Sequence, residues 1–173
     1  YQGKSYLNLE RDKGLDSQSK SADREITGKG VVLAICVGES RQSPKRQVTS
    51  TSVIKDFGLE GDIHGGVDHK QVSLLSLSSL EKNRKEGYEL NYGDLFENIV
   101  FQGLEDLFRY PIGTVLKVGQ SVILQITQIG KDHDVDIEVR GQKVHSIMPQ
   151  EGIFARVIKG GTIQEGDSLE VIA

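Results

Sequence analysis

The chain has one cysteine, one methionine, no tryptophan and only three prolines among its 173 residues. A single cysteine excludes an intrachain disulfide and any metal site built from thiolates alone. Cys36 lies in an apolar run, residues 31–37, which predicts a buried strand. Because a buried free cysteine usually packs as a small hydrophobic side chain, we favour that interpretation over a catalytic role for Cys36.

An excess of positive charge and a long apolar run are also missing. The chain carries 21 Lys and Arg against 25 Asp and Glu, a net charge of −4, so nothing in its overall charge favours nucleic acid or an anionic membrane as a partner. No apolar run approaches the roughly 20 residues of a membrane-spanning helix, and the first residues lack the pattern of a signal peptide. We expect a cytoplasmic protein without a membrane partner.

The chain divides into two parts that differ in composition and in hydrophobic periodicity. Residues 1–28 carry charged residues, serine and glycine without a sustained period, which predicts a tail, a linker or a vector-derived extension. Residues 29–173 form one domain of short alternating segments separated by turns. The segments that we predict as strands are 31–37, 48–54, 71–77, a strand after Asn98, a hairpin over 111–129 that turns at Gly119, and the C-terminal segments 153–158 and 169–171.

One segment favours a helix. Ser78 or Ser79 can cap it, and Gly87 can end it. Seven or more short strands with so few helices predict a mostly β, barrel-like domain with one or two short helices.

A glycine-rich stretch, residues 58–75, is the most informative part of the sequence. It has four glycines in nine residues, together with Asp62, His64 and His69, and it leads directly into a predicted strand. A polar loop at the start of a strand is a common place for function, because the scaffold holds it rigidly. The alternative is a hairpin loop in which Asp62 and His64 bond only to their own backbone; the local sequence leaves both open.

Several motifs in chain order resemble the MOSC domain (molybdenum cofactor sulfurase C-terminal domain), in its small stand-alone bacterial form. They extend over about residues 29–172, and they are Gly61-Asp62-x-His64-Gly65-Gly66, Gln71-Val72-Ser73-Leu74-Leu75, Gly93-Asp94-Leu95-x-Glu97-Asn98-Ile99, Pro111-Ile112-Gly113-Thr114, Gln128-Ile129-Gly130-Lys131, Glu151-Gly152-Ile153-Phe154-Ala155-Arg156-Val157, and Gly160-Gly161 with Gly166-Asp167. The resemblance implies a β-barrel with a pocket for molybdenum cofactor, or for sulfur destined for it. It also implies a cysteine that serves as persulfide carrier or metal ligand.

The sequence departs from the family at that cysteine. His133 occupies the expected position, and no cysteine follows it. Imidazole can bind a metal but cannot form a persulfide, so sulfur relay through His133 is excluded. Cys36 and His133 are therefore the two catalytic candidates: either Cys36 has taken over, or the pocket persists without the chemistry.

The resemblance, with the residues around each motif, defines the expected pocket. Lysine, arginine and glycine amides suit a phosphate, so Lys70, Lys131, Arg140, Arg156 and the amides of Gly65 and Gly66 are candidate donors. Arg156 can face solvent or the pocket, and we favour the pocket; for Glu97 and Asn98 we favour ordering of loops over lining the pocket. The residues that we expect to bind the cofactor are Asp62, His64, Gly65, Gly66, Lys70, Glu97, Asn98, Lys131 and Arg156.

A metal site is a further hypothesis. His64, His69 and their neighbouring acids, with the segment Asp132-His133-Asp134-x-Asp136, supply imidazole and carboxylate ligands, and His133 is the metal-ligand candidate. The spacing matches no known signature. The alternative is an ordered loop and a solvated acidic tip, with His145 on the surface.

Three functions follow. The first is a MOSC-like domain that binds molybdenum cofactor, or a related anion, as an accessory to cofactor maturation or sulfur transfer. The second is a degenerate, non-enzymatic module that binds a partner, such as a molybdenum cofactor biosynthesis protein or a molybdoenzyme. The third is a metal-dependent hydrolase or reductase.

Overall fold

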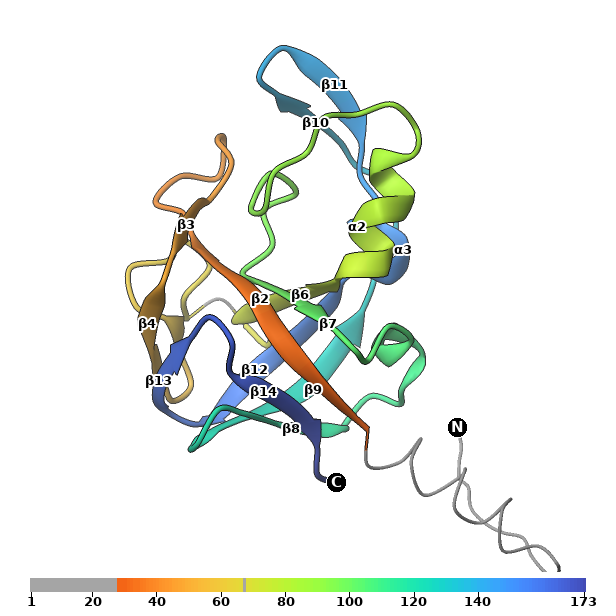
Figure 1. The fold of residues 1–173 in the computed structure, drawn as a ribbon. Helices are drawn as coiled ribbons and strands as arrows, with labels where there is room; N and C mark the ends of the chain where they lie inside the picture. The colour runs from red at the N-terminus through yellow and green to blue at the C-terminus, as the bar shows by residue number, and fades with distance from the viewer. Residues whose placement is uncertain (1–27, 67) are drawn as a thin grey trace, which may run out of the picture.

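A closed barrel of seven strands forms the centre of the computed structural model, which describes residues 28–66 and 68–173. Around the barrel the strands run in the order β14, β8, β9, β12, β6, β7, β2, and β14 pairs with β2 to close it (Figure 1). Their bounds are β2 Lys29–Val37, β6 Val72–Ser76, β7 Ile99–Gln102, β8 Val115–Val118, β9 Val122–Ile129, β12 Ile153–Lys159 and β14 Ser168–Val171. The predicted mostly β barrel is confirmed.

One pair of barrel strands is parallel. Parallel neighbours need a crossover, and α2 (Leu77–Arg84) leads the chain from the end of β6 towards β7. Ser76 caps this helix, because its side chain accepts a hydrogen bond from the backbone N–H of Ser79 at 3.1 Å. The predicted cap at Ser78 or Ser79 is therefore corrected to Ser76, and the helix ends at Arg84, before Gly87.

Smaller elements surround the barrel. The predicted strand 48–54 is two strands. β3 (Arg46–Val48) pairs antiparallel with the end of β2, and β4 (Ser50–Ile54) follows it. β4 lies between β5 (Gly58–Leu59) and β13 (Gly161–Gln164) in a three-stranded sheet. A hairpin of β10 (Asp136–Val139) and β11 (Gln142–His145) projects beside α2, and it is followed by α3 (Met148–Glu151); the short 3-10 turn η1 spans Leu107–Arg109.

Every second side chain along the strands points inward and fills the barrel. In β9, Val122, Leu124 and Ile126 are fully or almost fully buried, whereas the residues between them are half-exposed. Burying each of these side chains contributes about 1.5–3 kcal/mol. The predicted hairpin over 111–129 is confirmed, and its turn lies at Gly119, which has a φ of 64°.

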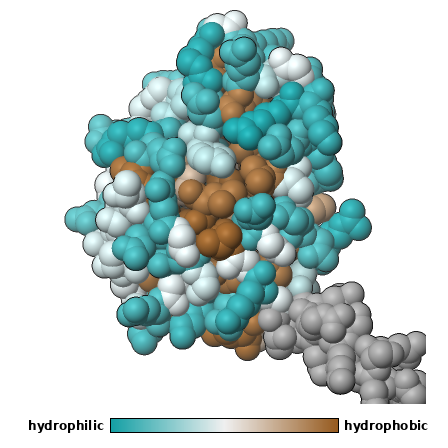
Figure 2. Space-filling view, viewed as in Figure 1, coloured by the Kyte–Doolittle hydropathy of each residue, from teal (hydrophilic) through white to brown (hydrophobic). Residues whose placement is uncertain are grey.

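A second apolar cluster lies outside the barrel, where α2 and the β10–β11 hairpin pack. It contains Cys36, Leu75, Leu80 and Val144, so Cys36 sits in a closed hydrophobic environment. On the face of the molecule seen in Figure 1, Figure 2 shows apolar side chains in the middle, in the region where β2 and β7 lie side by side, and polar side chains around them.

Residues 1–27 lie outside the described part of the chain, so the predicted tail stays a prediction. Among the described residues, no helix has the length and apolar character needed to cross a membrane.

Candidate functional site

The pocket that holds most of the predicted site residues has a volume of about 350 Å³ and lies beside the ends of several barrel strands. The glycine-rich loop, the loop before β7, the segment after β9 and the start of β12 all contribute to it. Its lining residues are Arg41, His64, Lys70, Ser73, Leu95, Phe96, Asn98, Lys131, Val135, Ile137, Ser146, Met148 and Phe154.

Phe154 forms the aromatic floor of this pocket. It lies in β12, paired with Ser73 of β6 and Gln128 of β9, so its ring is held by the barrel itself. The ammonium groups of Lys70 and Lys131 lie 5.8 and 5.9 Å from the centre of the ring, close enough for cation–π attraction. Burial, and then the charge of Lys70, lower the pKa of Lys131.

In the described part of the chain, no acidic side chain lines this pocket. Arg41, Lys70 and Lys131 line it, whereas its described lining contains no aspartate or glutamate. Two cations that share one partly enclosed space repel each other, and a bound anion relieves that repulsion. The pocket is therefore suited to an anionic ligand with a flat apolar part that can lie on Phe154.

Asn98 ties three strands together behind the lining. Its Oδ1 accepts hydrogen bonds from the backbone N–H and the hydroxyl of Ser73, at 3.0 and 3.3 Å, and its Nδ2 donates to the carbonyl of Cys36 at 3.0 Å. The side chain is fully buried, although Asn98 also contributes to the pocket wall. Its main role is therefore to fix the ends of β6, β7 and β2.

Glu97 orders the preceding loop and does not line the pocket. Its carboxylate accepts hydrogen bonds from the backbone N–H groups of Gly93 and Leu95, at 2.8 and 3.0 Å. Complete burial raises the pKa of Glu97 to about 7, although the two backbone N–H donors oppose that shift. The favoured loop-ordering interpretation agrees with this geometry.

The glycine-rich loop uses its glycine amides internally. The N–H of Gly65 donates to the carbonyl of Asp62 at 3.0 Å, and that of Gly66 donates to the carbonyl of Phe57 at 2.6 Å. A side chain at Gly65 would collide with the Phe57 ring. The two amides that we expected to face a phosphate therefore already have partners.

Lys45 is the residue of this region that the sequence did not reveal. Its side chain is completely buried, and its ammonium lies 2.7 and 2.9 Å from the two carboxylate oxygens of Asp62 and 2.9 Å from Nδ1 of His64. Asp62 is thus a buried partner of Lys45, and His64 alone of the three reaches the pocket. Nothing in the local sequence distinguishes Lys45 from the exposed Arg41 and Arg46 nearby.

Two predicted residues lie elsewhere. Arg156 is 46% exposed and places Nη2 3.6 Å from Oδ1 of Asp56, so the expectation that it points into the pocket is corrected. The reason is that β12 carries it past the pocket, towards the turn after β4. His133 is exposed and does not line the pocket, although Lys131 and Val135 on either side of it do.

The metal hypothesis finds no ligand set in the described part of the chain. Among residues 28–66 and 68–173, no three His, Cys, Asp or Glu side chains gather closely enough to hold a metal ion. His69 bonds to Gln128, at 2.8 Å between Nε2 and Oε1. His145 is half-exposed, as expected, and its Nδ1 lies 2.8 Å from Oδ1 of Asp136.

Cys36 does not replace the missing family cysteine at the pocket. Its side chain is fully buried and lies outside the lining. Burial, followed by the negative charge of Glu97, raises the pKa of the thiol far above its ordinary value. A thiol that stays protonated and enclosed is neither a nucleophile nor a sulfur carrier.

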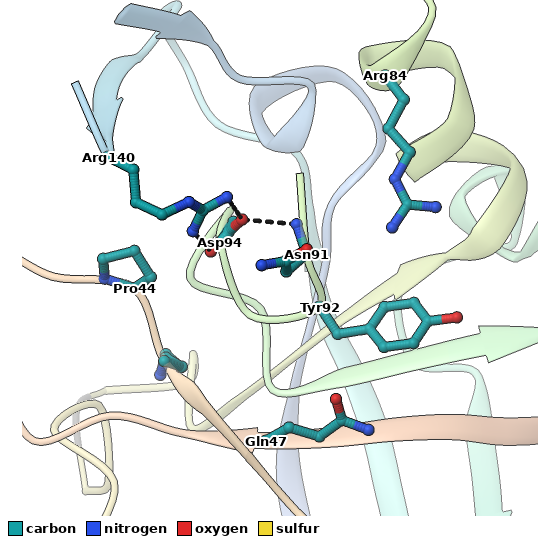
Figure 3. A pocket seen from close by; sticks show the side chains of 8 residues that line it. Pro44, Gln47, Arg84, Asn91, Tyr92, Asp94 and Arg140 are labelled. Atoms are coloured by element: carbon teal, nitrogen blue, oxygen red, sulfur yellow. Dashed lines mark hydrogen bonds and ion pairs between the residues drawn. The ribbon is translucent and has the colours of Figure 1, made fainter. Parts of the chain in front are cut away.

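A second hollow, of about 570 Å³, has Arg84, Tyr92, Asp94 and Arg140 among its lining residues (Figure 3). Arg140 and Asp94 face each other there in a two-point ion pair, with distances of 2.9 and 2.7 Å. Arg84 lies above the ring of Tyr92 and donates two hydrogen bonds to the carbonyl of Leu90. Because both guanidinium groups are already engaged, this hollow suits an anion less well than the first pocket.

A comparison with family models matches residues 60–170, more than half of the chain, to the MOSC domain. No curated protein matches the chain by sequence.

Solved structures repeat the fold at low sequence identity. The YuaD protein from Bacillus subtilis has a TM-score of 0.64 at 16% identity, over 84% of this chain and 96% of that one. YiiM from Geobacillus stearothermophilus gives 0.59 at 16% identity, over 83% and 75%, and YiiM from Escherichia coli gives 0.57 at 19% identity, over 84% and 70%. At such identities the likeness extends to the fold alone.

Proposed function

Because the chain belongs to the MOSC domain family, we propose that its pocket binds molybdenum cofactor, or a closely related pterin phosphate, as an accessory step in cofactor maturation. The observation that carries the proposal is a pocket lined by three cations, two of them over one aromatic ring, without an acid in the described lining. The protein then holds the cofactor and passes it to a biosynthesis protein or a molybdoenzyme.

The residues of the pocket suit the parts of such a ligand. Lys70 and Lys131 bind the phosphate, with Arg41 at the rim, because ammonium and guanidinium groups are its natural donors. Phe154 stacks against the planar pterin, and the apolar side chains of Ile137 and Met148 exclude water from the other side. When bound, the cofactor supplies the molybdenum centre.

Sulfur transfer is not part of this proposal. The family cysteine position holds His133, and Cys36 is enclosed in the apolar cluster. Carriage of a sulfane sulfur needs an accessible thiolate, so this chain protects and delivers its ligand without adding sulfur to it.

Anaerobic retention of the cofactor tests the proposal. Purified protein is mixed with molybdopterin cofactor and separated by gel filtration, and the pterin in the protein fraction is measured. We expect the wild type to retain it and Lys70→Met/Lys131→Met to lose at least about a hundredfold in affinity, since each of the two removed charge–anion contacts is worth roughly 1.5–3 kcal/mol. Lys55→Met, an exposed change outside the pocket, is the matched control. No retention by the wild type contradicts the proposal.

A further inference from the structure

Three side chains behind the pocket form a buried chain of contacts. Asp62 and Lys45 have no exposed side-chain surface, and His64, at the end of the chain, is 31% exposed. The Lys45 ammonium lies 2.7 and 2.9 Å from the Asp62 oxygens and 2.9 Å from Nδ1 of His64. We propose that Lys45 is a positioning residue that fixes His64 as the neutral imidazole with its proton on Nε2, and so creates a permanent hydrogen-bond donor in the pocket.

The protons of the three groups lead to this assignment. An ammonium group has three N–H donors and no lone pair, so every partner of the Lys45 ammonium must accept. Asp62 accepts with its two oxygens, and Nδ1 of His64 must therefore accept with its lone pair. The proton of a neutral imidazole then belongs on Nε2. A doubly protonated ring would point an N–H at the ammonium.

The position of Lys45 is itself fixed. The Asp62 carboxylate also accepts from the N–H of Gly38 at 2.9 Å, and from the N–H of His64 at 3.2 Å. The backbone N–H of Lys45 donates to the carbonyl of Gly93 at 3.0 Å. Gly93 has a φ of 91°, and a Cβ there would collide with the carbonyl of Lys45, so only glycine allows this close approach.

The other edge of the imidazole faces the pocket. The two ring nitrogens point in nearly opposite directions, so with Nδ1 against buried Lys45 the exposed edge of His64 carries Nε2. Burial, and then the positive charge of Lys45, lower the pKa of His64 to about 4, which agrees with a neutral ring. The pocket thus presents one uncharged donor beside three cations, and it selects a ligand with a hydrogen-bond acceptor at that point. This selection rests on the proposed function, whereas the tautomer does not.

Nuclear magnetic resonance of ¹⁵N-labelled full-length protein tests the tautomer without any ligand. Long-range ¹H–¹⁵N correlations distinguish a protonated Nε2 from a protonated Nδ1. We expect a single Nε2–H form of His64 in the wild type from about pH 6 to 8. A protonated Nδ1, or an imidazolium form at pH 7, overturns the proposal.

Variants separate positioning from a merely structural role. Lys45→Met leaves Asp62 buried without a cation, so Lys45→Met/Asp62→Asn removes both charges together. Circular dichroism shows which of these two variants is folded. In each folded variant we expect the His64 ring to become a mixture of both neutral tautomers. Lys55→Met serves as control and leaves the ring unchanged. A ring that keeps a pure Nε2–H form without Lys45 overturns the proposal.

Binding measurements then separate this inference from the proposed function. With molybdopterin cofactor as the probe, His64→Leu lowers affinity about tenfold, whereas His64→Gln, whose amide can donate, keeps most of it. If the wild type shows the Nε2–H form but retains no cofactor, the proposed function fails while the positioning role stands. If the cofactor binds equally well to wild type and His64→Leu, the selective role of the donor fails while the proposed function stands.

Discussion

Lys70 and Lys131 bring their ammonium groups to the same ring, Phe154, at 5.8 and 5.9 Å from its centre. The two lysines come from different loops, one before β6 and one after β9. Their charges therefore influence each other, and the pKa of Lys131 is lowered by burial and then by Lys70.

This coupling can be measured directly. In Lys70→Met the repulsion from the second cation disappears, so the pKa of Lys131 rises towards its ordinary value. The ¹³Cε resonance of Lys131, followed through an alkaline titration, reports the change. Lys55→Met is the control, and an identical Lys131 titration in both variants would refute the coupling.

Glu97 makes stability depend on pH. Its pKa in the folded protein, about 7, lies above its ordinary value of 4.5, so between these values the folded state binds more protons than the unfolded state. The free energy of unfolding therefore falls as the pH rises through this window, by up to about 1.4 kcal/mol per pH unit. Glu97→Gln, which cannot ionise, removes this slope in urea unfolding at pH 5, 6 and 7. Glu39→Gln, a change at an exposed position, keeps the pH slope of the wild type. A slope in Glu97→Gln equal to that of the wild type would disprove its assignment to Glu97.

We expect Asn98 to contribute more to the stability of the barrel than to ligand binding. Asn98→Ala leaves the N–H of Ser73 and the carbonyl of Cys36 without their side-chain partner in a buried place. Each of these two losses costs about 1–3 kcal/mol, so we expect destabilisation by roughly 2–6 kcal/mol in chemical denaturation. Gln120→Ala, in the exposed turn between β8 and β9, should change stability by less than about 0.5 kcal/mol. A near-neutral Asn98→Ala would mean that these contacts contribute little.

Cys36 should be inert in the native protein. Because the thiol is buried and its pKa is raised, alkylating reagents and a persulfide donor should fail to modify it at pH 8. Mass spectrometry should find full modification only after denaturation. Cofactor retention by Cys36→Ala should equal that of the wild type. Rapid labelling of the native thiol, or transfer of sulfur to it, would restore Cys36 as a sulfur carrier.

The sequence predicted most of the barrel because strand periodicity and turn glycines are local signals. The hairpin around Gly119 and the strand containing Cys36 both follow from alternation and apolar runs. The helix cap was misplaced, because Ser76, Ser78 and Ser79 are all good caps and only the end of β6 decides among them.

The site was only partly predictable, because its geometry depends on contacts between distant segments. Lys70 and Lys131 were identified as donors, and the structure brings them together. Lys45 was missed because a buried lysine has no sequence signal until its partners are placed. Arg156 was misplaced because a charge within a strand gives no information on which side of the sheet it emerges.

The most direct test of the cationic pocket is a crystal structure of the protein grown with molybdopterin cofactor. We expect the phosphate within hydrogen-bonding distance of Nζ of Lys70 and Lys131, and the pterin ring against Phe154. Cofactor bound instead between Arg84 and Arg140, or no cofactor in the 350 Å³ pocket at saturating concentration, would contradict this conclusion.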